Sequence, residues 1–427
     1  MIFLSHVDLI VLSLVVVMTL GFITFFLSKK VNISSIPILI VLGIIFGPVL
    51  GFIDRGNATT LFNYVRVIGL VIILFAEGHN LKWPLLKKHM ATIGILDTIG
   101  LFVTAIVAGL FFSLFFHLPF LAGFLFGAII SATDPATLIP LFKQNKVNEN
   151  IRTVIVTESI FNDPLGIVLT VLAVALAVPQ ASSAQFIEAI AKYTTLYPAA
   201  VIFFLYEIGI SVVIGVILGI VGYWIARKLK IDTFPEIYAL SLAFGGFLIG
   251  EWAQASGYLV ATTIGIVWGN HDIFFKKNGE SKKFGDLMES ELHFNEILSD
   301  FATVFIFILI GATVDLNVFG SALIMGSIVA LIVVFVARPI AGLTVLPLRK
   351  WSAKEYLFIS LEGPRGVVPS ALAGLPLSLG IMYKNPVLTQ WGEVILAATV
   401  ITVLESVIIE TLWVRPLSKR LLKDSIE

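Results

Sequence analysis

Two carboxylates lie inside an otherwise apolar stretch of the chain. Residues 157–164 read Thr-Glu-Ser-Ile-Phe-Asn-Asp-Pro, so Glu158 and Asp163 stand where a membrane-spanning segment would carry no charge. A second polar group, Thr-Asp-Pro at 133–135, precedes it in another apolar stretch. Ionisable groups at membrane depth are costly and usually mark the path of an ion or a proton. The two groups therefore predict a site that handles one or both.

The spacing within this stretch divides the polar side chains between two faces of a helix. Ser159 and Asp163 stand at positions i and i+4 on one face, and Glu158 and Asn162 share the adjoining face. Hard cations such as Na⁺ take oxygen ligands, which carboxylates and hydroxyl groups supply. Burial favours the protonated form of a carboxylate. Asp163 is therefore expected to hold a proton or a cation, but not both, and such competition is sufficient for exchange.

Three further residues are candidates for the same site. Asp134 follows Thr133 at a predicted break in a helix, where its carboxylate either binds the ion directly or caps the half-helix that follows. Thr133 offers its hydroxyl or its carbonyl oxygen. Glu77 ends another apolar segment in Phe-Ala-Glu-Gly-His, so it reaches the site, lines the cytoplasmic entrance or is solvated at the helix end.

Glu158 is expected to have an arginine partner, because an unpaired buried charge is very costly and a bidentate guanidinium is the usual remedy. Arg338 and Arg365 are the intramembrane candidates, and their positions do not choose between them. We interpret such a pair as structural. Asp97 and Asp300 lie near the predicted inner ends of their segments, where they are expected to be wet, so they are weaker candidates.

Composition assigns the chain to a class. Its 427 residues are 58% hydrophobic and 13% charged, with a mean hydropathy of +1.00, whereas soluble domains carry about 25% charged residues. We therefore predict an all-α polytopic membrane protein. The sequence has no cysteine, no His-Glu-x-x-His motif and no phosphate-binding glycine-rich loop, which argues against thiol chemistry, a metalloprotease and an ATP-driven pump. No cofactor is expected, and the Lys and Arg runs indicate membrane topology, not nucleic-acid binding.

Apolar stretches long enough to cross a bilayer predict thirteen spans: 7–28, 36–53, 62–80, 90–116, 119–142, 151–178, 197–226, 235–251, 255–269, 293–313, 318–346, 354–380 and 389–414. The first lacks a preceding basic residue and a small-residue cleavage site, so we interpret it as a helix, not a cleaved signal peptide. With the N-terminus outside, most of the 28 Lys and Arg residues fall in inside loops. If 235–269 formed one helix instead of two, the loops that follow it would change sides, and a cluster of lysines would lie outside. We therefore expect thirteen helices, with the N-terminus outside and the C-terminus cytoplasmic.

Two predicted spans contain helix-breaking residues. Pro135 follows Asp134 in span five, with Pro140 beyond it, and Glu-Gly-Pro-Arg-Gly at 362–366 interrupts span twelve. Interrupted helices at corresponding positions of two halves point to the binding site of a transporter. Two six-helix repeats, spans one to six and eight to thirteen, place the breaks in register, and the odd offset inverts the second repeat. Freed carbonyls suit a cation and exposed helix dipole ends suit a carboxylate.

Four motifs resemble those of the sodium/proton antiporters of the NhaP/NHE type. They are Ser-Ala-Thr-Asp-Pro-Ala-Thr at 131–137, Glu-Ser-Ile-Phe-Asn-Asp-Pro at 158–164, Ala-Arg-Pro at 337–339 and Glu-Gly-Pro-Arg-Gly-Val-Val-Pro at 362–369. The match spans most of the chain in the same order. It implies an NhaA-like antiporter fold in a homodimer, in which a core domain with crossed broken helices moves like an elevator against a dimerisation domain.

The resemblance also places these parts in the chain, which is one integral membrane unit. The core would occupy approximately 90–178 and 293–380, and the dimerisation or scaffold part approximately 1–53 and 197–269.

The resemblance further assigns roles to the candidate residues. Asp163 would bind the ion and the proton, and Asn162 takes the place of a second aspartate found in electrogenic relatives, which implies electroneutral one-for-one exchange. Glu158 would pair with Arg338 of the Ala-Arg-Pro motif, and Arg365 would stabilise the second broken helix. The remaining cation ligands would be Asp134, Ser159, the Thr133 carbonyl and Glu77, the last of which lies outside the motifs.

We therefore expect a secondary transporter, not an enzyme, that exchanges Na⁺ or Li⁺ for H⁺ across the plasma membrane. A K⁺/H⁺ antiporter of the same fold and a channel-like cation conductor are the alternatives, and crossed broken helices favour alternating access over an open pore. A membrane-embedded enzyme would need a nucleophile and a base at one depth, which these spans do not offer. The expected partners are the cations, protons, the lipid bilayer and a second copy of the chain. The sequence does not choose among Na⁺, Li⁺ and K⁺.

Overall fold

The computed structural model describes residues 6–31, 33–134, 138–139, 142, 147–229, 231, 233–274, 282–348 and 350–422. They form helices and connecting segments, with no strand among them. In chain order the helices are α1 (His6–Val31), α2 (Ser35–Ile44), η1 (Ile45–Val49), α3 (Arg55–Asn80), α4 (Trp83–Ile95), η2 (Leu96–Gly100), α5 (Leu101–Phe116), α6 (Phe120–Ser131), α8 (Glu149–Ala177), α9 (Ser182–Ala191), α10 (Leu196–Leu229), α11 (Pro235–Trp252), α12 (Gly257–Gly269), α13 (His271–Phe274), α14 (Lys282–Thr313), α15 (Leu316–Ile332), η3 (Val333–Ala337), α16 (Arg338–Gly342), η4 (Leu343–Leu348), α17 (Ala353–Leu361), α18 (Val367–Ala373), α19 (Leu375–Met382) and α20 (Pro386–Leu421).

Long apolar helices dominate the chain, as a bilayer requires, because a helix satisfies its backbone groups internally. Within the described ranges, 8 stretches are long and apolar enough to cross a membrane: Ile10–Ser28, Arg55–Asn80, Trp83–Phe116, Glu149–Ala177, Leu196–Leu229, Glu291–Thr313, Leu316–Leu348 and Pro386–Leu421. Shorter apolar helices cover Ser35–Val49, Phe120–Ser131, Gly257–Gly269 and Val367–Met382. The prediction of a helical polytopic membrane protein is therefore confirmed.

The described helices lie largely within the predicted spans, and two of them, α9 and α13, lie between spans. The stretch 235–269, which was predicted to form two spans instead of one, forms two helices, α11 and α12. The Ser256 side chain caps α12 by accepting a hydrogen bond from Leu259 N at 3.3 Å. The connection between predicted spans 151–178 and 197–226 contains a further helix, α9. The number of membrane crossings and the inverted repeats remain predictions.

Two helices stop in the middle of the molecule. α6 ends at Ser131 and residues 132–134 are not helical, while α17 ends at Leu361 and α18 begins only at Val367. A hydrogen bond of 2.8 Å from Asp134 N to Pro364 O joins the two interruptions. Pro135 and Pro140, which predicted the first break, lie outside the described residues.

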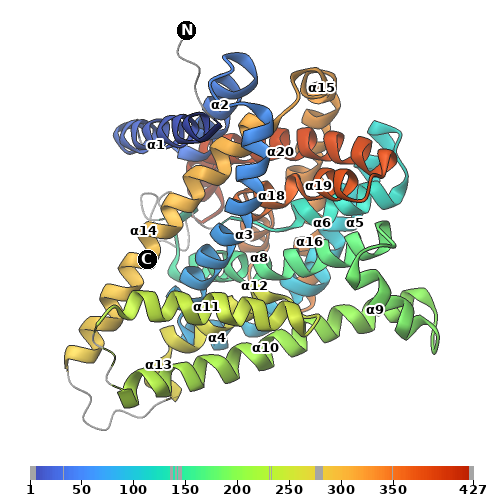
Figure 1. Cartoon of the computed structure of the whole chain (residues 1–427). Helices are drawn as coiled ribbons and strands as arrows, with labels where there is room; N and C mark the ends of the chain where they lie inside the picture. The colour runs from blue at the N-terminus through green and yellow to red at the C-terminus, as the bar shows by residue number, and fades with distance from the viewer. Residues whose placement is uncertain are drawn as a thin grey trace.

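The helix α8 lies at the centre of the molecule, in contact with α3, α6 and α18 (Figure 1). Close approach of α12 to α3 depends on small residues. A Cβ on Gly269 would lie 1.9 Å from His79 O, and one on Gly265 would lie 2.3 Å from Phe75 O. These contacts fix the end of α3 that carries Glu77 beside the site described below.

Candidate functional site

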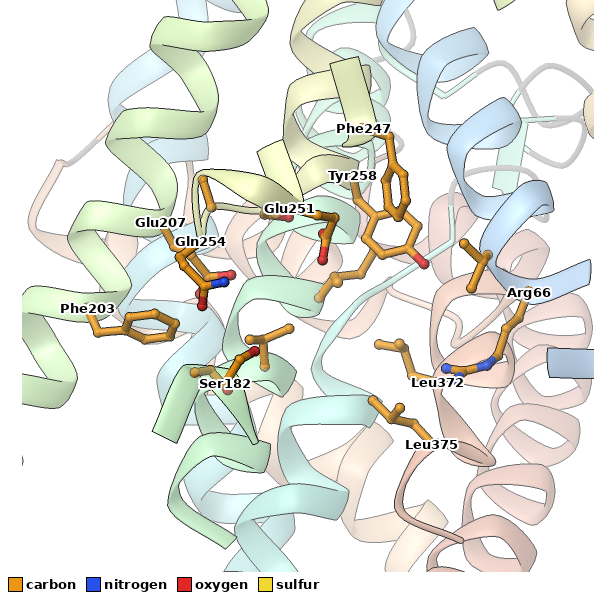
Figure 2. Close-up of a pocket in the computed structure, with 16 residues that line it drawn as sticks. Arg66, Ser182, Phe203, Glu207, Phe247, Glu251, Gln254, Tyr258, Leu372 and Leu375 are labelled. Atoms are coloured by element: carbon orange, nitrogen blue, oxygen red, sulfur yellow. The ribbon is translucent and has the colours of Figure 1, made fainter. Parts of the chain in front are cut away.

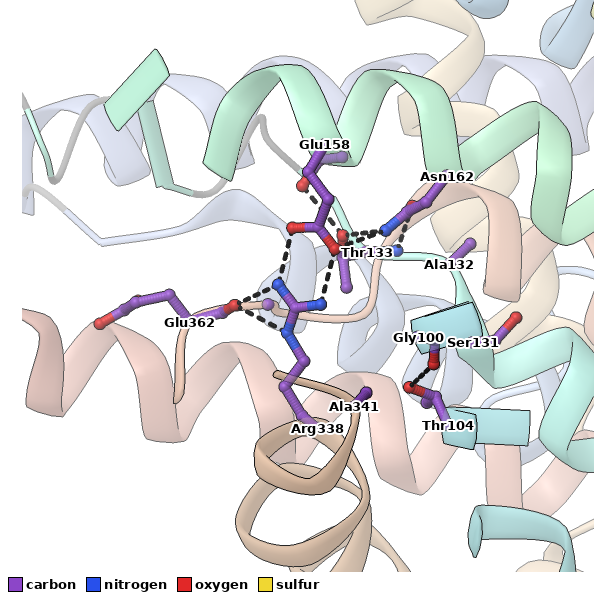
Figure 3. A network of polar contacts seen from close by, with 12 residues as sticks. Gly100, Thr104, Ser131, Ala132, Thr133, Glu158, Asn162, Arg338, Ala341 and Glu362 are labelled. Carbon is purple, nitrogen blue, oxygen red and sulfur yellow. Dashed lines mark hydrogen bonds and ion pairs between the residues drawn. The ribbon is translucent and has the colours of Figure 1, made fainter. Parts of the chain in front are cut away.

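The break after α6 is held by the polar face of α8. Thr133 N donates to Asn162 Oδ1 at 2.9 Å, and Asn162 Nδ2 donates to Thr133 Oγ1 at 2.7 Å. The hydroxyl groups of Thr133 and Ser159 lie 2.9 Å apart, and all three residues are buried. Both ends of the Asn162 amide thus clamp the non-helical backbone at Thr133 (Figure 3).

Glu158 and Arg338 form a buried, bidentate ion pair. Arg338 Nη1 donates to Glu158 Oε1 at 2.6 Å and Nη2 donates to Glu158 Oε2 at 2.7 Å, with side chains 6% and 1% exposed. Arg338 Nε and Nη2 also donate to the carbonyl of Glu362, at 3.1 and 3.0 Å (Figure 3). The structure therefore places Arg338, not Arg365, against Glu158, and the same guanidinium holds the second break.

Arg365 joins the two interruptions. Its backbone N, within the second break, donates to Ser406 Oγ at 3.0 Å. Its Nη1 donates to the carbonyls of Ser131 and Ala132 at 2.7 and 3.1 Å. Helix C-termini leave carbonyls without intrahelical donors, so the guanidinium caps α6, the first broken helix. The sequence interpretation had assigned Arg365 only to the second.

Asp163 sits among carboxylates at the centre of the molecule. It is 3% exposed, and no hydrogen-bond partner for its Oδ1 occurs in the described part of the chain. Glu77, Asp134, Asp97 and Glu158 are near enough to interact with it electrostatically. Glu77, whose position was open from sequence, therefore lies near this acidic cluster, with a partly exposed side chain whose Oε2 is buried.

The sequence analysis misjudged the burial of Asp97. Asp97 is 2% exposed, so the expectation that it is wet is wrong. The helix begins at Trp83, ahead of the predicted span, and Asp97 lies in the π-helical segment η2, which packs against α8. Asp300, by contrast, is exposed, as expected.

Residues of α20 complete the second break. Gly363 N donates to both carboxylate oxygens of Glu410, at 3.0 and 3.2 Å, and Ser406 binds Arg365 N. The sequence analysis had not assigned these residues a role. A signal was present, because Thr402, Ser406 and Glu410 recur at i, i+4 and i+8 and so lie on one face of a helix.

The site offers a mixed set of oxygen atoms. The carboxylates of Asp163, Asp134 and Glu77 are near enough to interact electrostatically with one another, and the hydroxyl groups of Thr133 and Ser159 are in contact. In the described ranges, no group of three or more His, Asp or Glu side chains has an arrangement that could hold a metal ion. The chemistry that this set suits is transient binding of a hard monovalent cation or a proton.

Apolar spanning helices, two joined interruptions and buried carboxylates beside them define a secondary transporter of ions. The family model for the transmembrane part of sodium/hydrogen exchangers matches residues 13–420. The chain belongs to this family of transporters.

Individual relatives agree with this assignment. The chain is 34% identical over 430 residues to Na(+)/H(+) antiporter 1 of Methanocaldococcus jannaschii, covering 95% of this chain and 94% of the relative. It is 26% identical to the K(+)/H(+) antiporter NhaP of Alkalimonas amylolytica, over 88% of this chain and 62% of that protein. The structure of the sodium proton antiporter MjNhaP1 from Methanocaldococcus jannaschii at pH 8 is similar with a TM-score of 0.84 at 31% identity, covering 98% of this chain and 100% of that one.

Proposed function

We propose that the chain exchanges Na⁺ or Li⁺ for H⁺ across the plasma membrane, with the cation and the proton competing for Asp163. The observation that carries this proposal is the buried Asp163 carboxylate, which has an oxygen without a hydrogen-bond partner among the described residues and lies beside an interrupted helix. A carboxylate in such a place is expected to take either a cation or a proton as its partner.

The remaining ligands of the proposed cation site are Asp134, Ser159, Glu77 and the Thr133 carbonyl. Thr133 and Ser159 are held in position by the hydrogen bonds of Asn162 and of each other. Glu158, Arg338 and Arg365 are proposed to act structurally, because their groups are used in the ion pair and in capping carbonyls.

The larger architecture is part of the proposal. It comprises thirteen membrane crossings, two inverted repeats, and a core at approximately 90–178 and 293–380. This core moves like an elevator against a scaffold at approximately 1–53 and 197–269 in a homodimer. The N-terminus would lie outside and the C-terminus in the cytoplasm. The hydrogen bonds between the two breaks, from Asp134 N to Pro364 O and from Arg365 Nη1 to the carbonyls of Ser131 and Ala132, support a core in which both broken helices move as one.

The cation is tested by exchange in sealed proteoliposomes. A pH gradient is imposed and followed with a pH-sensitive dye, and Na⁺, Li⁺ or K⁺ is added in turn. Dissipation by Na⁺ and Li⁺ but not by K⁺ is expected. Dissipation by K⁺ alone would support the alternative of K⁺/H⁺ exchange, which the 26% identity to a protein named as a K(+)/H(+) antiporter makes a specific competitor.

We expect exchange to be electroneutral, because Asn162 carries no charge and its amide already contacts Thr133 and Glu158. The initial rate of Na⁺-driven proton flux should be the same at zero and at an imposed potential of either sign, set by a potassium gradient with valinomycin. A rate that follows the potential would show net charge movement and would remove one-for-one stoichiometry from the account.

Gly366→Ala is expected to lower the exchange rate on the order of 10²-fold, since a misplacement of about 1 Å in a reacting site has such an effect. A Cβ on Gly366 would lie 1.7 Å from Asp134 Oδ2, so the carboxylate must move. Gly94→Ala is the matched control, because a Cβ on Gly94 meets no atom within 4 Å. Rates are compared at equal amounts of reconstituted protein, and equal rates for the two variants would show that the position of Asp134 is not critical.

A further inference from the structure

A cavity of about 320 Å³ lies beside α8, on the face that also carries Asp163. Ile167 and Val171 line the cavity. With Asp163 they occupy positions i, i+4 and i+8 of α8, so all three point to one side of the helix. A helix rises about 1.5 Å per residue, which places the floor of the cavity roughly 6 Å along α8 from Asp163, towards the C-terminal end of α8.

Three charged side chains line the cavity, each from a different helix. None of these three side chains belongs to the proposed cation site. Glu207 of α10, Glu251 of α11 and Arg66 of α3 all line it. Glu207 is 3% exposed, and no hydrogen-bond partner for its Oε2 occurs within the described ranges. Glu251 lies near enough to interact with Glu207 electrostatically. Figure 2 shows Arg66 on the opposite side of the cavity from Glu207.

The cavity has a polar mouth and an apolar floor. Ser182, Glu251 and Gln254 are lining residues that are exposed, whereas the lining residues Ile167 and Leu372 are buried. An ion that enters from the mouth therefore meets aliphatic side chains at the floor, where Ile167 lies one helical turn from Asp163 along α8.

The turn that carries the mouth is fixed to α10, the helix of Glu207. Tyr206 Oη donates to Ala253 O at 2.8 Å, and Ser256 N donates to Ser211 Oγ at 2.8 Å. These hydrogen bonds hold the end of α11, which carries Glu251, close to the part of α10 that carries Glu207.

We propose that this cavity is a second, capture site for a partly hydrated monovalent cation such as Na⁺. Glu207 is its buried ligand and Glu251 stands at its mouth. The cavity lies towards the C-terminal end of α8, which the predicted topology places at the outer side of the membrane, so it would serve that side. The inference deepens the proposed exchange and rests on it for the identity of the cation. Two carboxylates against one guanidinium make the cavity attractive to cations, and Ile167 and Leu372 retain the ion until Asp163 becomes accessible.

A labelling experiment tests the site without any transport. Because the chain has no cysteine, Ser182→Cys provides a single thiol at the mouth. A cationic and an uncharged methanethiosulfonate reagent of similar size are compared. The cationic reagent should react faster, and adding Glu207→Gln should reduce this preference by about two- to fourfold, as loss of one nearby screened charge predicts. Na⁺ should slow the cationic reagent more than choline at equal ionic strength.

Two matched controls accompany the labelling. Thr194→Cys places a thiol at an exposed position after α9 that does not line the cavity, and its preference should not respond to Glu207→Gln. Glu188→Gln removes the same charge from the exposed face of α9, and it should leave the preference at Ser182→Cys unchanged. A preference that is insensitive to Glu207→Gln, or equally sensitive to Glu188→Gln, would overturn the site.

Exchange measured with Na⁺ supplied on either side of the membrane distinguishes capture in the cavity from binding at Asp163. Glu207→Gln should raise the half-saturating Na⁺ concentration about two- to fourfold when Na⁺ is supplied on the cavity side, and leave it unchanged from the other side. Glu207→Asp should restore the wild-type value if the charge is what matters. An equal rise from both sides, or none, would overturn the capture role. If the wild type exchanges no Na⁺ but the labelling still depends on Glu207, the proposed function fails and the cation site stands.

Discussion

Asp163→Asn is expected to abolish cation/proton exchange and to leave the fold intact. The substitution keeps the shape of the side chain but removes the group that alternates between proton and cation. Its stability should be at least that of the wild type, because it removes a buried carboxylate whose Oδ1 has no partner among the described residues. Exchange in proteoliposomes and thermal unfolding of the purified protein are the two measurements.

The matched control is Asp300→Asn, which makes the same chemical change at an exposed position of α14. It should exchange at the wild-type rate. Wild-type exchange by Asp163→Asn would remove Asp163 from the mechanism. Loss of the folded protein on gel filtration would instead show that the carboxylate is structural.

Arg338→Met is expected to destabilise the protein by about 3–5 kcal/mol, because it leaves the buried Glu158 carboxylate without its partner. It also removes the two donors to the Glu362 carbonyl in the second break. The double variant Glu158→Gln/Arg338→Met should be more stable than Arg338→Met, since it removes the stranded charge. Thermal unfolding in detergent, followed by intrinsic fluorescence, provides the comparison.

A more exposed ion pair with a single contact of similar length is the control. Arg152 Nη2 contacts Glu149 Oε1 at 2.6 Å, with side chains 31% and 70% exposed. Arg152→Met should lower stability by less than about 1 kcal/mol, as for solvent-exposed pairs. If Arg338→Met unfolds at the same temperature as Arg152→Met, the buried pair is not a structural element of the core.

Local signals predicted the parts of the site that lie close together in the chain. The spacing of the polar residues at 157–164 predicted that Ser159 and Asp163 share one face of a helix. The Gly and Pro residues of 362–366 predicted an interrupted helix, because these residue types alter the conformation of their own backbone. The partner of Glu158 could not be settled from the residues alone. Arg338 lies 180 residues away, so the choice depends on how distant helices pack.

The same limit explains the residues that sequence reasoning misjudged. Asp97 was expected to be wet from its place near the end of a predicted span, but packing of η2 against α8 buries it. The guanidinium of Arg365 reaches the end of α6 because the two breaks lie side by side and are joined by hydrogen bonds. The spacing of residues within one segment does not predict this contact between two segments. Local propensity predicts elements, whereas contacts between them require their arrangement in space.

The competition of cation and proton for one carboxylate is the central claim, and the half-saturating Na⁺ concentration tests it most directly. It is measured in proteoliposomes at a series of pH values, together with the maximal rate. Competition predicts that, at acidic pH, the half-saturating Na⁺ concentration rises about tenfold for each unit by which the pH is lowered, as competition by one proton requires. The maximal rate should stay constant. A half-saturating concentration that does not change with pH would contradict the account.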